Sequence, residues 1–405
     1  MTPRIAILYH FLHPDDVVSA RHLGDLCAGL AERGWQVTAH PCNRACREAS
    51  QKYPRRTSWQ GVDIRRVWRP PLAQSSSAGR IVNSGWMLAA WLLRSLGRAG
   101  RETDVVMIGT DPIMSVLVAP WIRRFRPRTR IAHWCFDLYP EALVAGGMLR
   151  EGRWAYRAVK RRADAAYGAC DLIADIGPCM REKLGTREGV ARQVTLTPWA
   201  LSEPGKPAAP QPEAAGELFG EHRLGLLYSG TFGRAHTHEA FLALAERLRD
   251  SGVTFCFAVR GNRAAELQRA VDSGGPNVTS APFVEEAGLA RQLAAADVHL
   301  VSLRPEWSGL VVPSKFFGAL AAGRPVLFAG SRDSSVARWI DRYRVGWVLD
   351  DSSLQRITRE LGELSRDPAR LRALQHRCHS VYRERFSRDS VLAGWDAELR
   401  RLLEP

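Results

Sequence analysis

The chain lacks the features that mark membrane-spanning, secreted or metal-binding proteins. No hydrophobic run approaches the roughly 18 residues of a spanning helix, and the nearest, WMLAAWLL, covers only residues 86–93. Residues 1–4 lead directly into a buried-strand pattern, so we expect no signal peptide. The eight cysteines form no CxxC pair and no Cys/His metal pattern, which predicts free thiols in a reducing cytoplasm. GxxxxGK[ST], GxSxG, HExxH and DxD motifs are also missing, so nothing predicts a bound divalent metal.

Acidic residues are scarce in the first half only. Residues 1–200 contain 30 Lys+Arg against 17 Asp+Glu, whereas residues 201–405 contain 27 against 25. The excess gathers at residues 65–70, 121–130 and 156–162. A basic half can face nucleic acid, an anionic membrane or an anionic small substrate. Solvated arginine in an Arg-rich chain is the plain alternative.

Strand and helix patterns alternate in both halves, which predicts an α/β chain with parallel sheets. The length of 405 residues is too great for one typical domain. A Pro- and Ala-rich stretch, residues 202–216, separates the halves and predicts a linker or exposed loop. We therefore expect a first domain at 1–200, a linker at 201–220 and a second domain at 221–383. Both are expected to be Rossmann-like, with their strand ends lining a cleft.

The most informative segment is PSKFFGALAAGRPV, residues 313–326. It predicts an apolar helix at 316–322, opened by Ser314 and Lys315 and followed by a buried strand. A tight apolar loop, Gly309 to Val312, precedes it and includes Leu310 and Val311, with Glu306 upstream. Free N–H groups at a helix start bind phosphate, and Lys315 adds a positive charge. Ordinary packing of a helix on a sheet is the alternative.

A second strand–loop–helix pattern, LLYSGTFGRAHTHEA, covers residues 226–240. Gly230, Thr231 and Gly233 let the backbone approach a ligand, and the Arg234 guanidinium can hold two phosphate oxygens. A plain glycine turn with a solvated arginine is the alternative. Gly261 and Asn262 end another strand and form a weaker candidate site for a base or ribose.

In the first half, the candidate residues are carboxylates at strand ends. Asp137 in HWCFDLYPE can orient a hydroxyl or accept its proton, or it can cap the following turn. His133 shares its strand face, where core packing is the favoured interpretation. Asp15 and Asp16 can bind an acceptor hydroxyl in the loop at residues 13–22, which also holds two other candidate acceptor residues, Ser19 and Arg21. For Ser19 we favour a role as helix cap.

With these segments side by side, the chain resembles the family-4 glycosyltransferases of the GT-B fold over nearly its whole length. The motifs that carry the resemblance are the opening strand and helix, HWCFDLYPE, YSGTFGRAH, the region around PSKFFGALAAGRPV, and the closing YRERFSRDSVLAGWDAELRRLL. It implies two Rossmann-like domains facing a cleft, with a final helix, about residues 384–405, that crosses back to the first domain. The PSK variant is most like bacterial enzymes that build surface polysaccharide, such as N-acetylfucosamine transferases.

The chain departs from the family pattern at four places. Two glutamates usually lie eight positions apart near the signature helix, but Leu310 and Gly318 stand there, which leaves Glu306 as a candidate substitute. Phe136 replaces the usual histidine before Asp137. The usual lysine after the Gly–Arg loop is missing, and His236 and His238 occupy that region. Lys315 is the candidate replacement cation.

The resemblance implies a retaining transferase that moves a sugar from a nucleotide-diphosphate donor to an acceptor hydroxyl. Arg234, Lys315 and the N–H groups near 309–311 would stabilise the leaving diphosphate without a metal. The donor, a UDP- or GDP-sugar, is a substrate, so no cofactor is expected. Asp137 would position the acceptor or take its proton.

The expected acceptor is a polyprenyl-diphosphate-linked saccharide at an anionic membrane face. Trp86 and Trp91 would make the apolar contact with this membrane, and the arginine clusters would make the electrostatic contact. The expected location is therefore cytoplasmic, or peripheral on the inner membrane face; a core helix at residues 86–93 is the alternative. Two other functions remain open: a sugar-nucleotide epimerase on the same scaffold, and a non-enzymatic nucleic-acid binder. The latter is favoured by charge alone, since no recognition helix or aromatic RNA-binding motif is visible.

Overall fold

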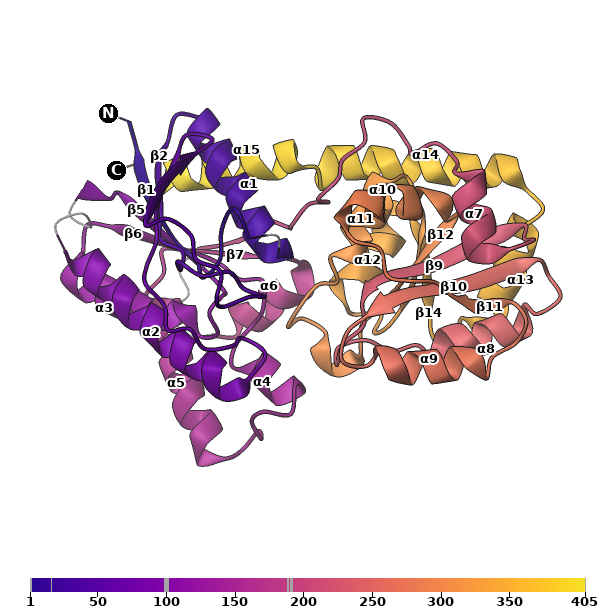
Figure 1. The fold of residues 1–405 in the computed structure, drawn as a ribbon, viewed down its shortest axis with the longest axis horizontal. Helices are drawn as coiled ribbons and strands as arrows, with labels where there is room; N and C mark the ends of the chain where they lie inside the picture. The colour runs from indigo at the N-terminus through magenta and orange to yellow at the C-terminus, as the bar shows by residue number, and fades with distance from the viewer. Residues whose placement is uncertain (1, 16, 98–101, 188, 190–191, 405) are drawn as a thin grey trace. The chain divides into compact units, whose positions relative to one another are not determined.

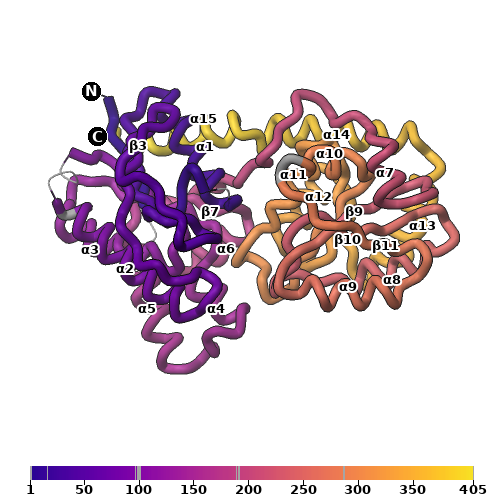
Figure 2. The backbone as a smooth tube through the Cα atoms, in the orientation of Figure 1, coloured from indigo at the N-terminus to yellow at the C-terminus, as the bar shows by residue number. Residues whose placement is uncertain are grey.

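The computed structural model describes residues 2–15, 17–97, 102–187, 189 and 192–404, and it divides into two compact units (Figure 1). Unit 1 is Met1–Thr197 with Val391–Pro405, and unit 2 is Pro198–Ser390. The backbone trace in Figure 2 runs through unit 1, then through unit 2, and ends again in unit 1. The unit boundaries therefore fall at 197/198 and 390/391, whereas the first domain was expected to end at 200 and the second at 383.

Unit 1 is built on an eight-stranded sheet in the order β3-β4-β2-β1-β5-β6-β7-β8. All neighbouring pairs are parallel except β3 and β4, an antiparallel edge hairpin that the sequence patterns did not predict. The strands are β1 (Arg4–Leu8), β2 (Gln36–Ala39), β3 (Arg56–Trp59), β4 (Val62–Arg65), β5 (Val105–Gly109), β6 (Arg130–Trp134), β7 (Leu172–Asp175) and β8 (Arg192–Thr195). Strands β5 and β7 are buried at every residue, as parallel strands covered on both faces require.

Helices pack against this sheet because its apolar faces must be covered. They are α1 (Val18–Glu32), α2 (Ser77–Leu96), η2 (Ser115–Val118), α3 (Ala119–Phe125), α4 (Glu141–Ala145), α5 (Trp154–Gly168), α6 (Pro178–Gly185) and α15 (Arg388–Arg401). The last helix returns to this unit. The Trp395 ring lies edge-on to Trp134 with centroids 5.2 Å apart, and Asp396 accepts a 2.7 Å hydrogen bond from the Trp35 indole.

Unit 2 has a six-stranded, fully parallel sheet in the order β11-β10-β9-β12-β13-β14. Its strands are β9 (Leu224–Thr231), β10 (Val253–Arg260), β11 (Val278–Ser280), β12 (Val298–Ser302), β13 (Val326–Ala329) and β14 (Gly346–Leu349). Its helices are α7 (Pro212–Phe219), α8 (Glu239–Arg247), α9 (Ala264–Asp272), α10 (Glu286–Ala295), η3 (Pro305–Trp307), α11 (Lys315–Ala321), α12 (Ser335–Tyr343), α13 (Leu354–Leu364) and α14 (Pro368–Arg385). This strand order is that of a dinucleotide-binding Rossmann domain.

The predicted linker at 201–220 is wrong for its second part, which forms α7. Ala214, Leu218 and Phe219 of this helix pack in a buried cluster with residues of β9 and β10. Ahead of α7, Ala208 donates its N–H to the Ala322 carbonyl at 3.1 Å. The helix is short and rich in Ala and Gly, so its apolar periodicity was too weak to detect in the sequence.

The packing of α15 on unit 1 can be tested at Trp395, which is fully buried. Trp395→Ala should lower the free energy of unfolding by about 3–5 kcal/mol, because it removes a large side chain from a filled site. Urea denaturation followed by circular dichroism measures the change. Leu403→Ala, at a side chain that is 37% exposed, is the control and should cost under about 0.5 kcal/mol. Equal midpoints for the two variants would contradict this packing.

Candidate functional site

In each unit, chemistry-bearing residues gather where two central parallel strands end. The strand order reverses direction between β1 and β5 in unit 1, and between β9 and β12 in unit 2. Loops that leave such neighbouring strands turn to opposite sides and open a crevice at the carboxyl ends of the strands. These two places therefore hold the candidate sites, and each is described within its own unit.

Lys315 is the centre of the strand-end site of unit 2. Its Nζ donates a 2.8 Å hydrogen bond to the carbonyl of Thr231, the last residue of β9. The same Nζ lies 5.2 Å from the centroid of the Tyr228 ring, a cation–π arrangement. Burial lowers the pKa of Lys315 to about 8. The ammonium is thus held at the end of the central strand and is readily stabilised by an incoming anion.

Two glycines let the loops of this site approach one another. Gly230 has φ 118°, and a Cβ there would lie 3.0 Å from Cε of Lys315. Gly261 has φ 130°, and a Cβ there would meet the Phe232 carbonyl oxygen at 2.5 Å. The end of β10 therefore fits against the loop after β9, and Oδ1 of Asn262 comes near Gly233. Gly230, Thr231, Gly233, Gly261, Asn262 and Lys315, all expected in the donor site, are brought together.

A network that the motifs did not predict holds this loop in place. The His236 carbonyl accepts hydrogen bonds from Arg263 at 2.6 Å and from Arg304 at 3.1 Å, and the ring Nδ1 of His236 lies 2.9 Å from the Ser302 carbonyl. Burial first, and then the charge of Lys315, lower the pKa of His236 to about 4. The ring is neutral at pH 7 and cannot replace the missing lysine charge, whereas Lys315, bonded to the Thr231 carbonyl, supplies a cation beside the loop.

Three other side chains that were expected in the donor site lie at the protein surface. Arg234 is exposed in the loop after β9, and Ser314 is exposed just before α11. Glu306 is exposed on η3, and no hydrogen bond or ion pair among the described residues joins it to Lys315. The expectation of free N–H groups at 309–311 is wrong for Leu310, which is buried and donates its N–H to the Trp307 carbonyl at 3.0 Å. The cause is a local turn: Gly309 has φ 75°, and Ser308 pairs with Val311 across it.

One group in unit 2 has metal-ligand chemistry that the sequence did not reveal. His238, Glu239 and Glu266 offer ligand atoms that all lie within 4.8 Å of one another. Glu266 is already engaged by the Arg263 guanidinium, and Glu239 accepts from the His238 N–H at 2.9 Å. These contacts stabilise the carboxylates without a metal.

The strand-end site of unit 1 contains two carboxylates. Asp111 follows β5, Asp137 follows β6, and the ring Nδ1 of His10, just past β1, lies 3.5 Å from Oδ1 of Asp111. Burial first, and then the nearby Asp111, raise the pKa of Asp137 to about 6. A carboxylate with that pKa is ionised at pH 7 but close to accepting a proton, as a general base requires. Asp111 was missed in the sequence, although DVVMIGTDP places it directly after a strand.

Hydroxyl groups surround these carboxylates. Burial, followed by the charge of Asp111, raises the pKa of the Tyr9 hydroxyl well above its usual value, while a hydrogen bond to Ser19 opposes this. The prediction that Ser19 caps a helix is wrong. Helix α1 begins at Val18 with Val17 as its N-cap residue, so Ser19 is inside the first turn and faces Tyr9. Burial and then Asp137 raise the pKa of Tyr139 in the same way.

Two of the remaining residues expected to bind the acceptor, Asp15 and His133, are buried and make contacts that hold the fold together. Asp15 is buried, and its Oδ1 accepts the Cys46 N–H at 3.0 Å, which fixes the segment after β2. His133 is buried in β6 with Nδ1 2.8 Å from the Ile108 carbonyl, and burial lowers its pKa to about 4. Core packing is therefore its observed role. Arg21 lies half-buried on α1, and Asp16 is outside the described residues.

The apolar run at 86–93 lies in α2 and divides between core and surface. Trp91 is fully buried and donates to the His40 carbonyl at 2.7 Å, so its expected membrane contact is wrong. Trp86 and Leu93 are exposed by 45% and 73%. No helix in the described parts of the chain combines the length and apolarity needed to cross a membrane.

Comparison with solved structures identifies the fold class of the chain. The sucrose-phosphate synthase of Thermosynechococcus elongatus matches with a TM-score of 0.74 and 14% identity, over 100% of this chain and 99% of that one. Anabaena Alr3699/HepE in complex with UDP matches with a TM-score of 0.65 and 10% identity, over 98% and 100%. At these identities the likeness concerns the fold, which is GT-B.

Sequence comparison agrees with the fold. Residues 19–199 match the family model described as a glycosyl transferase 4-like domain. The probable glycosyltransferase WbjE of Pseudomonas aeruginosa is 26% identical over 313 residues, 75% of this chain and 76% of WbjE. Residues 19–199 therefore resemble a family-4-like glycosyl transferase domain, and the whole chain has the GT-B fold.

The backbone at Gly230 offers a test of the geometry around Lys315. Gly230→Ala should destabilise the protein by about 1–3 kcal/mol, because φ 118° is strained for alanine and the new methyl group meets Lys315. Gly233→Ala is the matched control in the same loop; its Cβ would meet Asn262 at an ordinary 3.5 Å. Thermal denaturation of both variants makes the comparison, and equal melting temperatures would refute the loop geometry.

Proposed function

We propose that the protein is a retaining, sugar-nucleotide-dependent glycosyltransferase that works without a metal ion. The observation that carries the proposal is the Lys315 ammonium, which lies against the Thr231 carbonyl at the end of the central strand β9. In a GT-B chain this is where a donor diphosphate needs a cation. The glycine backbone at Gly230 leaves room for the phosphate oxygens beside it.

The chemistry follows from where charge develops. The bond between the sugar C1 and the diphosphate oxygen breaks, and negative charge grows on the leaving diphosphate. Lys315 and Arg234 would stabilise that charge as fixed donors, the role that a bound metal plays in other transferases. The acceptor oxygen forms the new bond on the same face of the sugar, and its proton passes to Asp137.

The donor is proposed to be a UDP- or GDP-sugar. Support comes from the fold neighbour HepE, whose structure is a complex with UDP. The nucleotide leaves as product in each turnover, so it is a substrate rather than a cofactor. Asn262 and Gly261, at the end of β10 beside the diphosphate loop, are the proposed contacts to the nucleoside.

The acceptor is proposed to be a lipid-linked saccharide in surface polysaccharide synthesis, used at the cytoplasmic face of a membrane. Two features of unit 1 support this: the net positive charge of residues 1–200 and the exposed apolar residues of α2. A peripheral enzyme needs both an electrostatic and an apolar contact with an anionic membrane.

Arg234→Ala tests the diphosphate assignment. Turnover with the true donor should fall by about 10²-fold or more, because one preorganised donor to the developing charge is lost. Arg269→Ala, at an exposed arginine on α9, removes the same charge elsewhere in unit 2 and should leave turnover unchanged. Steady-state kinetics of the two variants tests the assignment. Near-normal activity of Arg234→Ala would show that this residue does not stabilise the leaving diphosphate.

The pH dependence of kcat/KM reports the two titrating groups of the free enzyme. It should fall below about pH 6 as Asp137 takes up a proton, and above about pH 8 as Lys315 loses its own. Lys315→Arg keeps the cation protonated well past pH 10 and should abolish the alkaline limb. An alkaline limb that is unchanged in this variant would show that Lys315 is not the titrating group.

A further inference from the structure

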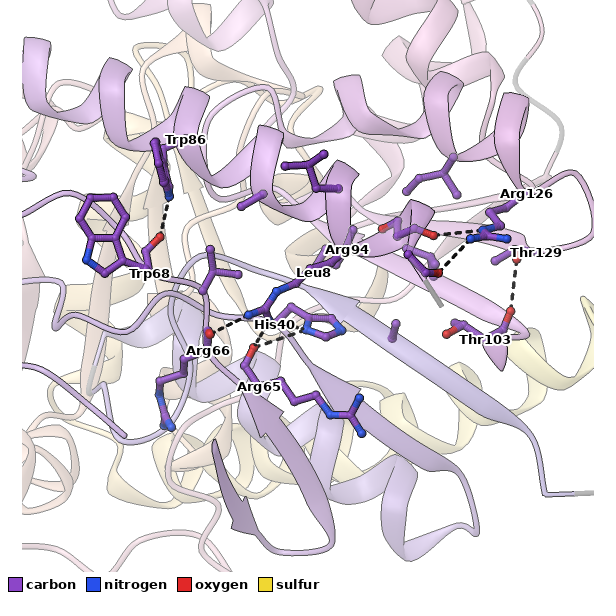
Figure 3. Close-up of a pocket in the computed structure, with 18 of the residues that line it drawn as sticks. Leu8, His40, Arg65, Arg66, Trp68, Trp86, Arg94, Thr103, Arg126 and Thr129 are labelled. Atoms are coloured by element: carbon purple, nitrogen blue, oxygen red, sulfur yellow. Dashed lines mark hydrogen bonds between the residues drawn. The ribbon is translucent and has the colours of Figure 1, made fainter. Parts of the chain in front are cut away.

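A groove of about 710 Å³ lies beside α2 in unit 1 (Figure 3). Helix α2 forms one side with Trp86 and Leu93, the hairpin of β3 and β4 forms another, and Leu8 and Val106 contribute apolar contacts from the sheet. Tyr9, Asp111 and Asp137 are not among the described residues that line it, so it is separate from the strand-end site of this unit.

The groove carries a large excess of positive charge. Its described lining contains no carboxylate and six arginines, which are Arg55, Arg56, Arg65, Arg66, Arg94 and Arg126. Asp63 pairs with Arg65 and neutralises one of them. Burial lowers the pKa of Arg94, and the charges of Arg65, Arg55 and Arg56 lower it further. These like charges repel one another, and an anion bound among them would relieve that repulsion.

The inner arginines are fixed by neutral partners. Arg94 donates to the backbone carbonyls of Arg65 at 2.6 Å and Arg66 at 3.0 Å, as drawn in Figure 3. Arg126 donates to the carbonyls of Ser95 and Gly97 at 3.1 and 2.9 Å. These bonds orient the guanidinium groups without cancelling their charge. Arg55 and Arg56 at the open edge are exposed and add two charges accessible to a ligand.

Apolar side chains lie at the other end of the groove. The rings of Trp68 and Trp86 pack edge to face with centroids 4.9 Å apart, and the Trp86 indole donates to the Trp68 carbonyl at 2.6 Å (Figure 3). Both remain about half exposed, at 46% and 45%. Ile81 and Val82 on the same helix are exposed by 73% and 50%. Amphipathic tryptophan beside exposed aliphatic residues is typical of a surface that meets a lipid layer.

We infer that this groove binds a single anionic lipid, with its phosphate among Arg55, Arg56 and Arg94 and its acyl chains against Trp68 and Trp86. A phosphate group accepts several guanidinium hydrogen bonds at once, which suits one fixed arginine with two exposed arginines beside it. Arginine next to tryptophan could also hold single-stranded RNA. Leu93, an aliphatic side chain that lines the groove and is 73% exposed, favours the lipid, because bases stack on aromatic rings and leave such side chains in water.

Vesicle co-sedimentation tests this inference on the full chain without any sugar donor, so its result is independent of the transferase assignment. The probes are vesicles of phosphatidylcholine alone and of phosphatidylcholine with 30% phosphatidylglycerol, at low salt. The variant Arg55→Gln/Arg56→Gln should bind the anionic vesicles about tenfold more weakly or worse. The control Arg372→Gln/Arg385→Gln makes the same charge change at exposed positions of α14 and should bind like the parent protein.

A soluble probe separates a groove from general surface attraction. Dihexanoyl phosphatidylglycerol, below its micelle concentration, should saturate one site in calorimetry, whereas glycerol 3-phosphate should bind at least tenfold more weakly because it lacks the chains. Trp86→Ser should remove that difference between the two probes. The inference is overturned if both double variants bind vesicles equally, if glycerol 3-phosphate binds as tightly as the lipid, or if oligo(U) RNA binds more tightly than the anionic vesicles.

Discussion

Parallel pairing of the central strands is the constraint on which both candidate sites depend. Parallel strands end at the same edge of a sheet, so loops far apart in the sequence must meet there. In unit 2 this brings the loop after β9 to the one after β12, where Ala235 accepts the Arg304 N–H at 2.8 Å. In unit 1 it brings His10 to Asp111, whose carbonyl accepts the His10 N–H at 3.0 Å.

Burial tunes the two sites in opposite senses. At Asp137, loss of water and a second carboxylate make the negative charge costly, so the group becomes a better proton acceptor. At Lys315, loss of water makes the positive charge costly, and a bound diphosphate compensates for it. A base and an anion-binding cation are the two elements that transfer of a sugar from a diphosphate to a hydroxyl requires.

The sequence was a good guide to strands and a weaker one to contacts. Buried strands such as β9 and β13 were recognisable because covered parallel strands are continuously apolar. The Gly230–Arg234 loop and Lys315 were recognised by residue type, but their meeting at the Thr231 carbonyl depends on a pairing 84 residues apart. Asp111 was missed although it directly follows β5, and the role of Ser19 was missed because it depends on a hydrogen bond with Tyr9, which lies just past β1. In the sequence, the arginines of the groove were recognised only as an excess of positive charge, because the β3–β4 hairpin that forms one side of the groove was not predicted.

The most direct test of the account is a thermal-shift screen with UDP-, GDP-, ADP- and TDP-sugars, run on the parent protein and on Lys315→Met. Ligand binding to the folded state raises the melting temperature by mass action. One nucleotide class should raise it by about 5 °C or more at roughly 100 times its Kd, and Lys315→Met should lose most of that shift. If none of the sugars shifts the parent protein, or if the variant responds equally, the proposed donor site at the end of β9 is contradicted.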